Sequence, residues 1–164
     1  MAQEKKPKIS FESFLESVEE NHRTFVQNLH DFLLSKDCKI TIEEKKSGFL
    51  ASYKYGKPLK AVANFLFRKS GMLVRFYGEN VGKYSDFLNT LPDEMIQKIA
   101  KSGICKRLVN NTCSPKCSGY DFTIGDEHFQ KCRYSCFEFL ITEESKPYIR
   151  KFAEHEIKER TNTN

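Results

Sequence analysis

The sequence lacks the features of a membrane or exported protein. Its 164 residues include no tryptophan and no internal repeat, and no apolar run approaches the ~20 residues that a transmembrane helix requires. The first residues, MAQEKKPKIS, are polar and Lys-rich, without the apolar stretch of a secretory signal. We therefore expect a cytoplasmic protein with no membrane partner, in a reducing compartment where disulfides are disfavoured.

The sequence also lacks the motifs of common enzyme classes. The Gly78–Gly82 segment follows an expected strand but has no Lys-Ser/Thr to make it a phosphate-binding loop. Neither G-x-S-x-G nor H-E-x-x-H occurs. His22 lies on an apolar helical stripe, which is typical of a half-buried structural histidine, and His155 and Glu156 lie among charges, as on a solvated helix face. The pattern favours a binding or adaptor protein over an enzyme.

The length and the net charge of the chain limit the possible architectures. A chain of 164 residues fits one domain with a sizeable core. We expect polar tails at residues 1–9 and 161–164 around a single α+β domain at 10–160, with 105–136 as a cysteine-rich, metal-binding insert. The net charge of +5 is spread along the chain, which fits a mixed-charge surface.

Apolar periodicity predicts how the first half folds. A stripe at helical spacing runs from Phe11 to Leu33, with Ser10 as N-cap, and the Glu19–Asn21 stretch would divide it into a helix pair. Four segments with short, Gly-containing connections then predict an antiparallel four-stranded meander, with the N-terminal helix on one face. These segments cover residues 39–43, 49–55, 61–67 and 72–77.

The second half returns to helix and then to strand. A helical segment follows Gly78 and includes a helix opened by Pro92-Asp93-Glu94, since proline and acids are favoured in a first turn. The cysteine-rich knob comes next. Alternating Phe137, Phe139 and Ile141 predict a final strand, and a C-terminal helix is expected from Glu143 to Arg160.

The cysteines form the most informative pattern. Five of the six lie between Cys105 and Cys136, and four make two C-x3-C pairs, Cys113 with Cys117 and Cys132 with Cys136. Ser114 and Pro115 supply turn chemistry within the first pair. A short hairpin, Tyr120–Ile124 with a Gly125-Asp126 turn, would join the pairs. Four thiolates suit a closed, structural zinc site.

Other interpretations of the cysteines stay open. Cys105 and His128 are spare ligand candidates, and iron is an alternative to zinc. Exposed thiols would instead suit metal handling or redox sensing, while unmetallated cysteines would pack as small buried side chains.

A basic, aromatic sheet face is a third candidate site. Lys54, Arg68, Lys69 and Arg75 come from the expected strands and turns, with Tyr53, Tyr55 and Tyr77 nearby. Such a surface binds single-stranded nucleic acid by stacking and phosphate contacts. An ordinary meander with Lys-rich edges has the same composition.

Three strand segments carry a family resemblance. Tyr53–Leu59, Ala61–Phe65 and Met72–Tyr77, with the later Cys136–Phe139 and Lys146–Ile149, resemble the bacterial YdhG-like superfamily of domains of unknown function. The whole chain looks like a Firmicutes-type protein with a cysteine-rich insert. The resemblance implies the same α+β fold and, because some members are described as iron chaperones, metal handling. The family's histidine before Phe76-Tyr77 is missing, so no functional residue is carried over. We expect a binding or adaptor domain with structural zinc and a protein partner.

Overall fold

The computed structural model describes residues 5–163, so residues 1–4 and 164 of the expected tails lie outside it. The helices are α1 (Phe11–Glu16), α2 (Glu20–Ser35), α3 (Ser85–Leu88), α4 (Asp93–Lys101), α5 (Lys106–Asn110) and α6 (Lys146–Asn162), with a 3-10 turn η1 (Val81–Lys83). The strands are β1 (Lys39–Lys45), β2 (Gly48–Tyr55), β3 (Lys60–Arg68), β4 (Gly71–Phe76), β5 (Tyr120–Ile124), β6 (Glu127–Lys131) and β7 (Glu138–Leu140).

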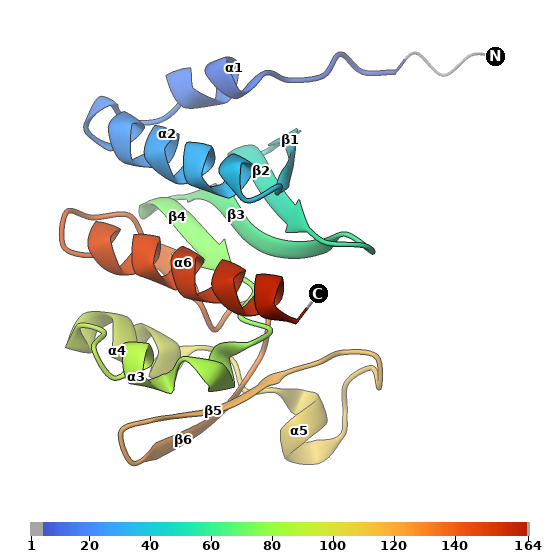
Figure 1. Ribbon diagram of the computed structural model, residues 1–164, viewed down its shortest axis with the longest axis vertical. Helices are drawn as coiled ribbons and strands as arrows, with labels where there is room; N and C mark the ends of the chain where they lie inside the picture. Colours follow the sequence, from blue (N-terminus) through green and yellow to red (C-terminus); the bar gives the residue numbers. More distant parts are fainter. Residues whose placement is uncertain (1–4, 164) are drawn as a thin grey trace.

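The expected α+β architecture is confirmed. Strands β1 to β4 form an antiparallel meander, and β7 joins beside β4 to make a five-stranded sheet in the order β1-β2-β3-β4-β7. Figure 1 shows α1, α2 and α6 as a layer in front of this sheet. The hairpin β5–β6 and α5 lie beyond α3 and α4, at the far end of the molecule from α1. Among residues 5–163, no helix has the length and apolarity needed to cross a bilayer.

The two N-terminal helices follow their sequence signals. Ser10 caps α1, since its Oγ accepts a hydrogen bond from the Ser13 amide at 3.1 Å. The chain bends after Ser17 and α2 starts at Glu20, as the acidic stretch predicts. α6 continues to Asn162, so residues 161 and 162 of the expected tail are helical.

One apolar core lies between the sheet and the helical layer. Strand residues of the helix-facing side, such as Tyr53, Phe65 and Phe76, are at most 1% exposed. Phe152 of α6 stacks on Phe76 with ring centroids 4.5 Å apart. Phe137, just before β7, lies 5.0 Å from Phe152 and 5.3 Å from Phe122 of the hairpin. The aromatic packing therefore continues from the sheet into the cysteine-bearing part of the chain.

Candidate functional site

The cysteine segment is built on the two-stranded sheet β5–β6, and residues 103–105 lie along β6. Ile104 forms an antiparallel bridge with Lys131. The Cys105 amide donates to the Gln130 carbonyl at 3.0 Å, and the Cys132 amide donates to the Gly103 carbonyl at 2.8 Å. Because side chains alternate along each strand, Cys105 and Cys132 lie on the same face of this bridge.

The opposite face of the hairpin packs on the core. Tyr120, Phe122, Phe129 and Lys131 are all buried. The Lys131 ammonium donates to the carbonyls of Ala100 and Ser102 at the end of α4, at 2.8 and 3.0 Å. A cation at the C-terminal end of a helix satisfies carbonyls that have no partner within the helix. This contact fixes the hairpin against α4.

The thiol of Cys105 occupies the space beside Gly119. A Cβ at Gly119 would overlap with both Sγ and Cβ of Cys105. Gly119 directly precedes β5, whose first residue, Tyr120, pairs with Lys131. A residue without a side chain is required here because the Cys105 thiol passes so close to the backbone.

Cys113 and Cys117 lie in the loop that follows α5. Asn111, the residue after α5, has a left-handed φ of 55°, and the chain turns back there. The Cys117 amide donates to the Ser114 carbonyl at 3.0 Å, and Ser114 Oγ accepts from the Lys116 amide at 3.3 Å, so the expected turn around Pro115 is confirmed.

The pKa of Cys117 reflects the thiols that surround it. Partial burial and the nearby thiols of Cys113, Cys105 and Cys132 together raise the pKa of Cys117, and Cys113 also hydrogen bonds with it. Cys113 is exposed, Cys117 and Cys132 are half-buried, and Cys105 is buried. The thiol of Cys117 therefore interacts with the thiols of Cys105, Cys113 and Cys132; we call these four residues the thiol cluster.

The structure places Cys136 elsewhere. Its amide donates to the Cys132 carbonyl at 3.0 Å, which makes one helical turn between the two cysteines. The Cys136 side chain is fully buried in the main apolar core. Burial raises the pKa of its thiol strongly, although a hydrogen bond with Ser102 opposes the shift. The sequence-predicted set of Cys113, Cys117, Cys132 and Cys136 thus has three members in the thiol cluster, and Cys105 is the fourth.

The remaining candidates lie away from the thiol cluster. His128 is exposed, and its Nε2 lies 2.5 Å from Oδ1 of Asp121. Cys38 is buried beside α2, where burial raises the pKa of its thiol to about 11. Within residues 5–163, no group of three or more His, Cys, Asp and Glu side chains is arranged to hold a metal ion as it stands.

The proposed nucleic-acid residues are arranged differently from the expectation. Arg75 donates twice to Glu138 Oε2, at 3.0 and 2.8 Å, and Arg68 Nε lies 3.8 Å from the other oxygen of that carboxylate. Lys54 and Lys69 are exposed. Tyr53 is fully buried on the helix side, where its hydroxyl lies 2.8 Å from His30 Nδ1. The two arginines therefore share one carboxylate, and Tyr53 has no exposed ring for a base.

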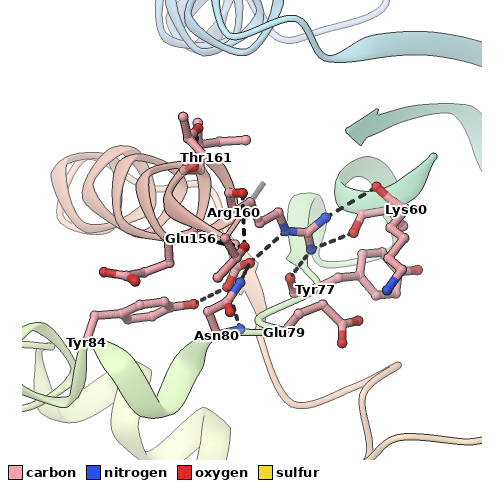
Figure 2. A network of polar contacts seen from close by, with 12 residues as sticks. Lys60, Tyr77, Glu79, Asn80, Tyr84, Glu156, Arg160 and Thr161 are labelled. Carbon is pink, nitrogen blue, oxygen red and sulfur yellow. Dashed lines mark hydrogen bonds and ion pairs between the residues drawn. The ribbon is translucent and has the colours of Figure 1, made fainter. Parts of the chain in front are cut away.

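A buried charge network lies where α6 meets the sheet (Figure 2). Glu156 is 0% exposed, and its carboxylate accepts four hydrogen bonds. The donors are the amide and Nδ2 of Asn80, both at 3.0 Å, the Tyr84 hydroxyl at 2.8 Å and Arg160 Nε at 2.7 Å. The expectation of a solvated face at Glu156 is wrong.

Arg160 connects this network to the sheet backbone. Its Nη2 donates to the carbonyls of Ala61 and Tyr77, both at 2.8 Å, and its Nη1 donates to the Lys60 carbonyl at 3.3 Å. Figure 2 shows the guanidinium between Glu156 and these carbonyls. The helical spacing of Ile149, Phe152, Ala153 and Ile157 continues through positions 156 and 160. That spacing is the sequence signal that indicates their burial.

Comparison of the chain with protein-family models, curated proteins and solved structures finds no match. The likeness to the YdhG-like superfamily therefore stays a prediction.

Proposed function

We propose that this protein is a binding domain whose cysteine segment is held together by a structural zinc ion, with Cys105, Cys113, Cys117 and Cys132 as ligands. The observation that carries the proposal is the interaction of the Cys117 thiol with the thiols of Cys105, Cys113 and Cys132. Cys105 itself is packed against Gly119. This ligand set differs from the one that the two C-x3-C pairs predict, because Cys105 takes the place of Cys136. Four thiolates complete the tetrahedral shell of zinc and leave no position for a water molecule, so the ion would have a structural role.

Zinc binding requires the four thiols to draw together, because no group of three or more potential ligands within residues 5–163 is arranged to hold a metal ion. Cys113 and Cys117 lie in residues 111–119, which contain a turn but no helix or strand. Rotation about one side-chain bond moves each sulfur, and the loop can follow. Zinc also favours the thiolate over the thiol, so binding releases protons and its free energy adds to folding.

The test is zinc content combined with amide hydrogen exchange. We expect about one zinc ion per chain in protein purified with reductant, bound by four thiolates. Chelation should increase exchange in residues 103–136 and leave β1 to β4 protected, since those strands belong to a separate sheet. Protein that binds no zinc, or that exchanges identically with and without it, would overturn the proposal.

The exposure of Cys113 favours metal handling as a second candidate function. An exposed ligand lets an incoming thiolate or metal ion attack the site directly. The rate at which zinc passes to a competing chelator distinguishes a structural site from a handling site. A structural site releases its ion only as the segment opens, at a rate independent of chelator concentration, whereas a handling site releases it at a rate that rises with that concentration.

A further inference from the structure

A polar cavity opens beside the buried charge network, at the end of the sheet where β2 turns into β3. Its volume is about 240 Å³, and its lining includes Lys57, Lys60, Glu79, Asn80 and Arg160. Several water molecules or one small ligand fit in this space. None of the four proposed zinc ligands lines the cavity.

The lining is positively charged after its ion pairs are taken into account. Glu156 neutralises Arg160, and Arg133 Nη2 donates to Glu79 at 2.6 Å. The side chains of Lys57 and Lys60 make no hydrogen bond or ion pair with another residue of the 5–163 range. Two lysines with unpaired ammonium groups therefore line a shared cavity.

Arg160 adds a fixed donor at the inner wall. A guanidinium has five N–H groups, and four of those of Arg160 are used by Glu156 and the three backbone carbonyls. One N–H of Nη1 remains, on a side chain only 7% exposed that lines the cavity. Since the network holds this guanidinium on every other side, its position is set before any ligand arrives.

We propose that this cavity binds a phosphate group, free or as part of a small phosphate ester. Lysine ammonium groups act as point charges toward phosphate, whereas carboxylate recognition favours the two-pronged fork of arginine. Here that fork is already occupied by Glu156 and backbone carbonyls, and lysines supply the free charge. Phosphate, with more negative charge than a carboxylate, is the better match.

The experiment is titration of the full chain with inorganic phosphate at constant ionic strength, followed by amide NMR shifts and calorimetry. We expect saturable binding, with shifts concentrated at residues 56–60 and 79–80. Acetate in a parallel titration should bind more weakly, and a small phosphate monoester at least as well as phosphate.

A pair of double variants provides the control. Lys57→Gln with Lys60→Gln should weaken phosphate binding about fivefold to tenfold, as expected for the loss of two partly exposed charges. Lys46→Gln with Lys69→Gln removes the same charge from turns at the opposite end of the sheet and should leave affinity unchanged. Non-saturable shifts, equal affinities in the two variants, or acetate binding as tight as phosphate binding would each overturn the proposal.

Discussion

The body of sheet and helices and the cysteine segment satisfy their buried polar groups to different degrees. In the body, even a fully buried carboxylate, Glu156, has four donors. Four buried side-chain nitrogen or oxygen atoms within residues 5–163 have no partner, and three belong to the segment: Arg107 Nε, Tyr120 OH and Arg133 Nε. Buried polar groups cost free energy when unpaired. The body therefore pairs its buried polar groups more completely than the segment does, and the proposed zinc ion would add stability where that pairing is incomplete.

Breaking the network should have the largest effect on the body. Glu156→Ala leaves Arg160 buried without its counter-charge and Asn80 and Tyr84 without an acceptor. We expect a loss of about 3–5 kcal/mol in the free energy of unfolding, measured by urea denaturation.

Glu154→Ala is the matched control on the same helix. Its carboxylate accepts from Arg150 Nε at 2.8 Å, and both side chains are more than a third exposed. Such a pair contributes roughly 0–1 kcal/mol. Equal destabilisation by the two variants would show that the buried network is not what holds α6 on the sheet.

Filling the space beside Cys105 should have an intermediate effect confined to the segment. The added methyl of Gly119→Ala collides with the Cys105 side chain, so we expect a cost of about 1–3 kcal/mol and weaker zinc binding in a chelator competition. Gly82→Ala is the control, because nothing lies within 4 Å of a Cβ at that position. Normal zinc affinity in Gly119→Ala would argue against Cys105 as a ligand.

The smallest expected effect is a pH dependence in the body. Burial lowers the pKa of His30, against the opposing charges of Asp31 and Glu12. The unfolded chain then binds a proton more readily than the folded one, so the stabilisation is present at neutral pH and is lost as pH falls below about 6.5. Melting temperatures from pH 7.5 to 5.5 should decline less steeply in His30→Gln. An unchanged slope would show that His30 is not the group responsible.

Local pattern was sufficient to predict the body. Alternation at Ala51 and Tyr53, and the run from 61 to 67 that is apolar on both faces, indicate strands of the meander, and Ser10 indicates the start of α1. Local spacing does not predict whether Cys105 or Cys136 joins the other three thiols. The answer depends on two tertiary features: the bridge between Ile104 and Lys131, and the burial of Cys136 in the main core. At Glu156 the charge predicts an exposed side chain, whereas the helical spacing of the apolar residues predicts a buried one. The side chain is buried, so the spacing is the better guide.

The most direct test of the zinc proposal is the zinc content of two single variants purified side by side. Cys113→Ala removes an exposed member of the thiol cluster, and Cys136→Ala removes the core cysteine of the second C-x3-C pair. We predict that Cys113→Ala loses its zinc while Cys136→Ala keeps about one ion per chain, as a closed four-thiolate site requires. Zinc lost from Cys136→Ala but retained by Cys113→Ala, with both variants folded, would contradict the ligand set drawn from the structure.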